Sequence, residues 1–183
     1  MLKDAGVDFV QQAAEVDESG IKRDQQARKR PVGEAAAALA LAKAKDVAAK
    51  RPGDLVLGAD QILACDGVWF DKPTDKAEAR TQLYAFRGRH HDLITAACVV
   101  KDKHVLWQHV EIARLWVRPF GSPFIDAYIR REGKRLFGSV GAYRLEGPGI
   151  QLFERIEGDH FTILGLPLFP LLKFLRFQGV LEG

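Results

Sequence analysis

The sequence predicts an α/β fold, with a mixed sheet that contains a long antiparallel hairpin and is flanked by helices. Three observations predict it: an Ala-rich run at 32–50 favours helix, two extended segments at 91–100 and 104–117 flank a short polar turn, and further helical patterns follow each of these features. No internal repeat and no Ser/Gly-rich linker divides the chain, so we expect residues 1–183 to form a single domain with two lobes around a cleft.

The N-terminal part is expected to contain little regular structure. Residues 1–5 resemble the last turn of a helix that Gly6 closes, and residues 7–14 are predicted to be irregular or strand-like. An acidic cluster then precedes a basic stretch at 22–30, which we expect to be a mobile loop. The acidic cluster consists of Glu15, Asp17 and Glu18.

The middle of the chain alternates helical and extended patterns. The helix at 32–50 stops at a Pro-Gly pair, and the aliphatic residues that follow predict a buried strand that ends near Asp60. Asp66-Gly67 predicts a hairpin turn, because these residues accept positive φ angles. Thr74 is expected to cap a helix that runs to about Phe86, where apolar residues recur at helical spacing.

After the long hairpin, Ser122-Pro123 predicts the start of a helix that runs to about Arg131. Residues 149–157 and 161–164 are predicted to pair as strands around a Gly-Asp turn. Pro167 is expected to begin an amphipathic C-terminal helix whose apolar stripe covers a core.

Composition excludes several classes of protein. Apolar residues make up 47% and charged residues 28% of the chain, as in ordinary globular domains. The formal charge of +3 comes from 27 basic and 24 acidic residues of interspersed sign, so nucleic acid is not an expected partner. The longest apolar run, 163–172, is about half a membrane span, and we expect a cytoplasmic protein with no membrane partner. Cys65 and Cys98 lie in apolar runs and are predicted to be buried, reduced thiols.

The most informative motif is Gly58-Ala59-Asp60-Gln61, at the end of a predicted strand. Small residues at a strand end let a substrate approach, while the Asp and the Gln project into the crevice there. Asp60 is therefore the first candidate for a catalytic residue. An Asp at a strand end is more often a turn or capping residue, so this alternative stays open at this point.

Two loops have the chemistry to contact a flat, anionic ligand. Asp71-Lys72-Pro73 places an ammonium group on a rigid loop where it can meet a phosphate, although Lys72 can equally be an ordinary surface residue. The Gly-rich stretch 139–149 allows the backbone to lie against a flat ligand while Glu146 accepts hydrogen bonds from ring N–H groups. The alternative for this stretch is a plain turn.

Together these motifs resemble the Maf proteins, a family of nucleoside triphosphate pyrophosphatases also linked to inhibition of septum formation. The resemblance covers nearly the whole chain, in the family's order: GADQ at 58–61, DKP at 71–73, GRHH with a following Thr at 88–95, GAYRLEG at 141–147 and GDHFTILGLPL at 158–168. It implies an α/β fold with a deep cleft, a divalent cation such as Mg²⁺ or Mn²⁺, and a homodimer. It also implies a hydrolase that converts a nucleoside triphosphate, including modified or non-standard ones, to the monophosphate and pyrophosphate.

The resemblance further implies roles for individual residues. Asp60 matches the family's catalytic base, and Lys43 and Lys72 match its phosphate-contacting lysines. Asp17, which stands where Glu is common, matches the acidic cluster expected to bind the cation, together with Glu15.

Two further residues are implied to bind substrate and to indicate a branch of the family. Gln61 and Glu146 resemble the branch that accepts 7-methyl-GTP more than the dTTP/UTP branch, which tends to have Thr and Gln.

The chain departs from the family pattern at its front. Family members carry a strand that ends in a Ser-x-Ser-x-x-Arg-Arg loop around the phosphates, and residues 1–7 resemble the part that follows this loop. We therefore expect an N-terminally shortened chain with reduced activity and stability. This departure keeps an alternative function open, a catalytically weak nucleotide-binding regulator of cell division.

Overall fold

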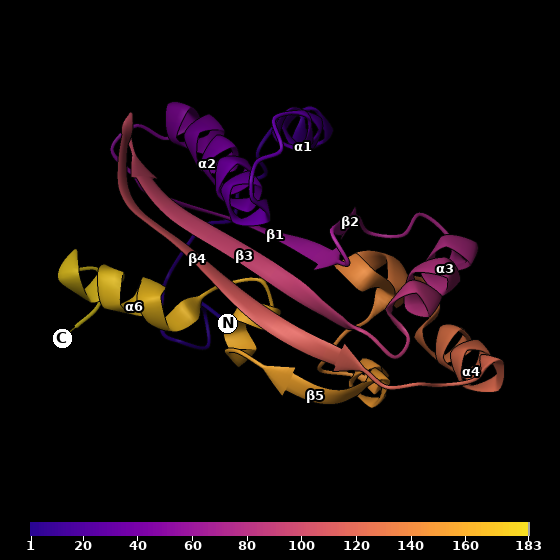
Figure 1. Cartoon of the computed structure of the whole chain (residues 1–183). Coiled ribbons are helices and arrows are strands. Elements are labelled where there is room, and N and C mark those ends of the chain that lie inside the picture. The colour runs from indigo at the N-terminus through magenta and orange to yellow at the C-terminus, as the bar shows by residue number, and fades with distance from the viewer. Residues whose placement is uncertain (183) are drawn as a thin grey trace. The chain divides into compact units, whose positions relative to one another are not determined.

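The computed structural model describes residues 1–182 (Figure 1). Contacts along the chain divide it into two compact units, which are described one at a time. Unit 1 comprises residues 1–61, 94–111 and 159 onward, and unit 2 comprises residues 62–93 and 112–158. Within the described residues, none of the helices combines the length and the apolar composition that crossing a bilayer requires.

The strands form one five-stranded antiparallel sheet in the order β2-β1-β3-β4-β5. The predicted α/β fold with a long antiparallel hairpin and flanking helices is therefore confirmed, but the prediction of a mixed sheet is wrong, because the strands pair antiparallel. The β3-β4 hairpin turns at Asp102, whose φ of 54° is positive, and the β1-β2 hairpin turns at the predicted Asp66-Gly67 pair. The strands are β1 (Leu55–Cys65), β2 (Val68–Phe70), β3 (His90–Lys101), β4 (His104–Val117) and β5 (Phe153–Glu157).

Unit 1 contains the helices α1 (Glu18–Ala27), α2 (Val32–Lys50), α5 (His160–Ile163) and α6 (Leu168–Phe177). The buried side of α6 packs against β3 in one apolar cluster, so the predicted amphipathic C-terminal helix covers a core. The buried members of this cluster are Val7, Ala97, Val99, Leu166, Leu168, Leu171, Phe174 and Leu175.

Gly58 sets how closely α2 approaches β1. A Cβ atom at this position would lie 2.4 Å from the Ala40 carbonyl oxygen and 2.9 Å from the Ala44 backbone nitrogen. Only glycine leaves room for the helix backbone here. The Ala-rich sequence of α2 contributes to the same close packing, because its buried residues are mostly Ala.

Unit 2 contains α3 (Lys76–Phe86) and α4 (Ser122–Glu132), which lie side by side in Figure 1, and three short 3₁₀ helices. These are Gly133–Gly138, Val140–Ala142 and Pro148–Leu152. The cap of α3 is Asp75, whose side chain accepts from the Glu78 backbone N–H, and not the predicted Thr74. Thr74, the residue before the cap, instead donates its backbone N–H and its hydroxyl to the Glu78 carboxylate.

The predicted mobile loop at 22–30 is wrong, because most of it belongs to α1. The Asp17 side chain accepts a hydrogen bond from the Gly20 backbone N–H and caps this helix. No residue of α1 is buried, and its only apolar residues besides Gly20 are Ile21 and Ala27, so its sequence lacks the apolar stripe that identifies a packed helix.

Two other predictions about elements are also wrong. The strand expected to end near Asp60 continues to Cys65, because residues 62, 63 and 65 are buried in unit 2. Residues 161–164 do not form a strand. The Asp159 side chain caps the backbone N–H groups of Phe161 and Thr162, which starts α5, and β5 pairs with β4 instead.

At the N-terminus the chain makes the closing turn of a helix without the helix itself. The Gly6 N–H donates to the Lys3 carbonyl and the Val7 N–H donates to the Leu2 carbonyl, with Gly6 at a φ of 75°. This is the bond pattern of a Schellman C-cap. As predicted, residues 7–14 have no regular secondary structure and both cysteines are buried and free.

Candidate active site

The candidate site in unit 1 is built around a buried ion pair between α2 and β1. The Lys43 ammonium lies 2.6 Å from Asp60 Oδ1, and the Asp60 side chain is only 8% exposed. The other carboxylate oxygen, Oδ2, is buried and has no hydrogen-bond partner within the described residues. Because a buried polar atom without a partner is costly, this oxygen has the properties of a group that binds something from outside the chain.

A third charged group completes the cluster. Lys43 Nζ is also 3.0 Å from Glu18 Oε1, so one ammonium group bridges two carboxylates. Glu18 is half-exposed, whereas Asp60 is buried, so the cluster reaches from the protein interior to the solvent. The positive charge of Lys22, one helical turn after Glu18, also acts on Asp60.

Burial controls the protonation of this cluster. Burial raises the pKa of the Asp60 carboxyl, and the ion pair with Lys43 opposes this effect without cancelling it. Burial by itself would lower the pKa of Lys43, but its bonds to Asp60 and Glu18 outweigh burial and raise that pKa. The ammonium therefore stays charged, next to a carboxylate that is more basic than an exposed Asp.

The two residues predicted to bind the cation have other contacts. Asp17 Oδ1 is 2.8 Å from the Gly20 backbone nitrogen as the α1 cap, and its Oδ2 is 4.0 Å from Arg23. Glu15 is largely exposed and lies 3.3 Å from Lys50 Nζ. Of the acidic cluster at 15–18, Glu18 is the member that the structure brings into contact with Lys43.

Gln61 points away from the ion pair, because successive side chains of a strand lie on opposite faces. Its amide nitrogen donates to Thr95 Oγ1 at 2.7 Å and to the Thr162 carbonyl at 2.9 Å. Thr95 also donates to the Thr162 carbonyl, so the three residues form a closed network between β1, β3 and α5. The Gln61 side chain thus ties the strand that carries Asp60 to α5.

Lys72 and Glu146 belong to unit 2, and both are exposed there. The loop of Lys72 is held against α3 by a hydrogen bond from the Gln82 amide to the Asp71 carbonyl. Glu146 lies in a tight turn in which a Cβ atom at Gly149 would come within 2.5 Å of the Arg144 carbonyl oxygen. Glycine is required at 149 for this close approach, which accounts for one residue of the Gly-rich pattern.

Unit 2 has a buried polar pair of a different kind. His91 Nε2 and the Tyr143 hydroxyl share a hydrogen bond of 2.6 Å, and His91 is fully buried among Phe86, Phe153 and Tyr143. Burial lowers the pKa of His91 to about 3, so the imidazole is neutral at physiological pH. Its Nδ1 atom has no hydrogen-bond partner within residues 1–182.

Comparison with known proteins decides the family. The profile of the family described as Maf-like protein matches residues 1–178, which is nearly the whole chain. The chain belongs to the Maf family. The sequence motifs at 58–61, 71–73 and 141–147 all lie within the matched residues, and the ion pair at Asp60 lies in the first of them.

Several members of the Maf family are close relatives. A nucleoside triphosphate pyrophosphatase of Granulibacter bethesdensis is 49% identical over 176 residues, which cover 96% of this chain and 89% of that protein. The 7-methyl-GTP pyrophosphatases of Rhizobium johnstonii and Brucella suis are each 44% identical over 183 residues, which cover 100% of this chain and 92% of each relative.

Glu18 and Lys22 are not among the site residues that the sequence predicts. The sequence does carry a helix signal here, because Glu18 and Lys22 are four residues apart and follow Asp17, a good helix N-cap. Once residues 18–27 form a helix, both side chains lie on one face. Because residues 22–30 were predicted to be a loop, the helical spacing of Glu18 and Lys22 was not recognised.

Proposed function

We propose that this chain is a nucleoside triphosphate pyrophosphatase, which hydrolyses its substrate to the nucleoside monophosphate and pyrophosphate. The observation that carries the proposal is the buried Asp60 carboxylate, which has one oxygen bound to Lys43 and the other without a partner among the described residues. Family membership and the activities for which the relatives are named support the same function.

In this proposal Asp60 is the general base. Its raised pKa increases its affinity for a proton, and its unpartnered Oδ2 accepts a hydrogen bond from the attacking water. The water oxygen attacks the α-phosphorus, the bond from that phosphorus to the α–β bridging oxygen breaks, and pyrophosphate leaves. The proton passes to Asp60 and then to solvent.

Lys43 supplies positive charge where the phosphates develop negative charge. Its raised pKa keeps the ammonium protonated, and its contacts with Asp60 and Glu18 hold it in place before substrate arrives. Lys72 is proposed to contact the phosphates as a second point charge from the loop of unit 2. The cleft between two lobes that the sequence predicts is also part of this proposal.

The residues present fit a divalent cation of the Mg²⁺ or Mn²⁺ type. Glu18 is a half-exposed carboxylate beside the Lys43 ammonium, and Asp17 and Glu15 on the same segment offer further hard oxygen donors. Among the described residues no group of three or more His, Cys, Asp or Glu side chains is arranged to hold a metal, so substrate phosphate oxygens must complete the coordination. When bound, such a cation offsets the negative charge of the triphosphate. We propose Asp17 and Glu15, as the family resemblance implies, together with Glu18 as the residues that would hold the cation, which leaves Asp60 Oδ2 to act as the base.

The finer substrate preference is proposed to be that of the 7-methyl-GTP branch. Relatives at 44% identity bear that name, which supports the expectation from Gln61 and Glu146. Because the Gln61 amide N–H groups are occupied by unit 1, we propose that Gln61 acts through its side-chain carbonyl oxygen, while Glu146 accepts hydrogen bonds from the base. A homodimer and a cytoplasmic location complete the proposal.

The test is an Asp60→Asn variant, which keeps the shape of the side chain and removes the base. With 7-methyl-GTP, dTTP and UTP as substrates, we expect the wild-type chain to form monophosphate and pyrophosphate in equal amounts and the variant to lose at least about a hundredfold in kcat. Asp54→Asn, an exposed Asp just before β1, is the matched control and should keep wild-type turnover.

Two outcomes contradict the proposal. In water enriched in oxygen-18, attack at the α-phosphorus places the label in the monophosphate, whereas label in the pyrophosphate would show attack at another atom. Nucleotide binding by calorimetry without any product would favour the alternative function, a regulator of cell division with little turnover.

A further inference from the structure

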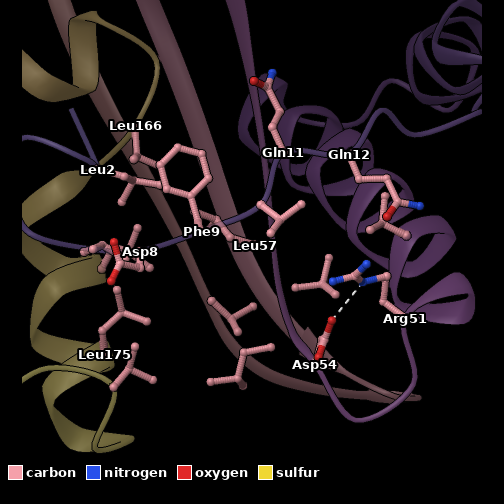
Figure 2. A pocket seen from close by; sticks show the side chains of 18 of the residues that line it. Leu2, Asp8, Phe9, Gln11, Gln12, Arg51, Asp54, Leu57, Leu166 and Leu175 are labelled. Carbon is pink, nitrogen blue, oxygen red and sulfur yellow. Dashed lines mark hydrogen bonds and ion pairs between the residues drawn. The ribbon is translucent and has the colours of Figure 1, made fainter.

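Unit 2 contains an Arg–carboxylate pair that differs from the surface ion pairs of this chain. The Arg51–Asp54 pair, which lies beside a groove of unit 1 in Figure 2, is typical of a surface pair: Arg51 Nε is 2.8 Å from Asp54 Oδ2, and both side chains are about half-exposed. Such a pair contributes little to stability. In the Glu132–Arg144 pair of unit 2, Arg144 Nε is 3.3 Å from Glu132 Oε2, and the Glu132 side chain is only 1% exposed. Glu132 is therefore a buried acidic residue.

The buried carboxylate of Glu132 is only partly paired. Its Oε2 atom lies next to Arg144, and its Oε1 atom has no hydrogen-bond partner within the described residues. A buried ionised carboxylate is costly unless it is well paired, and replacing a buried ion pair by apolar residues is often neutral or stabilising. The stability of the core therefore does not account for a Glu at this position.

Helix α4 holds this carboxylate against the Gly-rich stretch 139–149. Tyr128, one helical turn before Glu132, donates its hydroxyl to the Ala142 carbonyl at 3.0 Å, so two buried polar groups of α4 contact the stretch. Burial raises the pKa of Tyr128, the negative charge of Glu132 adds to this effect, and the positive charge of Arg144 opposes it. The charge of Glu132 is therefore held at a fixed place beside this stretch.

Arg144 extends from this buried contact to the protein surface. Its side chain is 41% exposed, and a Cβ atom at Gly147 would lie 3.2 Å from its Nη2 atom, so the guanidinium group is close to the backbone at Gly147. The Gly147 N–H donates to the Arg144 carbonyl at 3.3 Å, which closes a turn that contains the exposed Glu146. One turn thus carries a guanidinium group and a carboxylate, and Glu132 pairs with the guanidinium from the inside.

The three charged groups sum to one negative charge. Glu132 compensates the charge of Arg144, and the carboxylate of Glu146 remains uncompensated within this group. A guanine base that is methylated at N7 carries a positive charge, whereas an unmodified guanine base is neutral. Because opposite charges attract even where solvent weakens the interaction, a turn with this net charge distinguishes the two bases.

We propose that Glu132 is a specificity-determining residue, which cancels the charge of Arg144 and so makes the turn at 144–147 prefer nucleoside triphosphates whose purine base is positively charged. The inference rests on the proposed function, in which Glu146 accepts hydrogen bonds from the base. Glu132 does not touch the substrate and acts through Arg144. It therefore affects how the base binds and not the step at Asp60, so its effect is on KM and not on kcat.

The first experiment changes the charge of the base and leaves the protein unchanged. The two substrates are 7-methyl-GTP and 7-deaza-7-methyl-GTP, in which a neutral carbon replaces the charged N7 atom while the methyl group and the shape are kept. At mildly acidic pH the methylated base keeps its ring proton and its positive charge. We expect the KM of the wild-type chain to be at least about fivefold lower for 7-methyl-GTP. Equal KM values overturn the proposal, and this result does not depend on how any variant folds.

Variants then test whether Glu132 is the origin of the preference. Glu132→Gln leaves Arg144 uncompensated, so the difference in KM between the two substrates should disappear while kcat stays the same for both. The double variant Glu132→Gln/Arg144→Gln has the original net charge and should regain the difference. Asp54→Asn removes the same charge from the exposed pair with Arg51 and is the matched control, which should keep the difference. A purely structural role of Glu132 predicts equal losses for both substrates and no recovery in the double variant.

Failure of this inference is distinguishable from failure of the proposed function. If the wild-type chain forms no monophosphate and pyrophosphate from either substrate, the proposed function is wrong. Hydrolysis of both with equal KM values leaves that function intact and overturns only the role of Glu132. Without turnover, the dissociation constants of the two nucleotides from calorimetry replace KM, and the same ratio of at least about fivefold is expected. Equal dissociation constants then overturn the inference as well.

Discussion

The Lys43–Asp60 pair of unit 1 and the His91–Tyr143 pair of unit 2 are both buried polar contacts of 2.6 Å. They differ in charge and in access. Asp60 is linked through Lys43 to the half-exposed Glu18, whereas His91 is enclosed by aromatic rings and held neutral by burial. A buried polar pair can serve chemistry when it keeps its charge and a route to solvent. Without these it is a part of the core.

The largest expected effect concerns the enclosed pair. The pKa of His91 is about 3 in the folded chain and 6.5 in the unfolded chain, so between these pH values only the unfolded chain binds the proton. The stability that His91 contributes is complete above pH 6.5 and is lost as the pH falls toward 3, by about 4 to 5 kcal/mol in total. Chemical denaturation at a series of pH values measures this loss.

A His91→Gln variant keeps a hydrogen-bonding group and removes the titration. Its free energy of unfolding should depend less steeply on pH over this range, even if it is lower at pH 7. His104→Gln, at an exposed histidine, is the control and should match the wild-type slope. An unchanged slope for His91→Gln would mean that His91 is protonated in the folded chain.

The next effect concerns the charged pair. Lys43→Met removes the ammonium that opposes the effect of burial on Asp60, so the pKa of Asp60 should rise further. We expect turnover to fall by about a hundredfold and the acidic limb of the pH–rate profile to move to higher pH. Lys45→Met, at an exposed position of the same helix, should change neither quantity. If the acidic limb stays in place, Asp60 is not the general base.

The smallest effect concerns the packing that brings the charged pair together. Gly58→Ala introduces a Cβ atom into the backbone of α2, and we expect a loss of about 1 to 3 kcal/mol in unfolding free energy together with reduced turnover. Gly138→Ala is the matched control, because a Cβ atom there meets nothing within 4 Å and the backbone is not in the positive-φ region. Equal stability of the two variants would show that α2 can move away from β1 without cost.

The elements that the sequence predicted well are those whose signal is local. The Ala-rich helix α2, the β3–β4 hairpin, the Pro-started helix α4 and the Asp66-Gly67 turn each carry composition or turn chemistry that specifies them without a neighbour. The predictions were wrong where the local signal was weak or was not recognised. Helix α1 has few apolar residues to mark it, and residues 161–164 became a helix through the side-chain cap at Asp159.

By itself, the sequence determined the α/β class, the Maf family motifs and the choice of Asp60 and Lys43, because these depend on residue types at fixed positions along the chain. Only the tertiary structure decided that Glu18 is the third member of the charged cluster and that Gln61 is bound into a network with Thr95. The physical reason is that each of these depends on contacts between residues far apart in sequence. Burial, the pKa shifts that follow from it and the pairing of strand edges exist only when such residues are brought together.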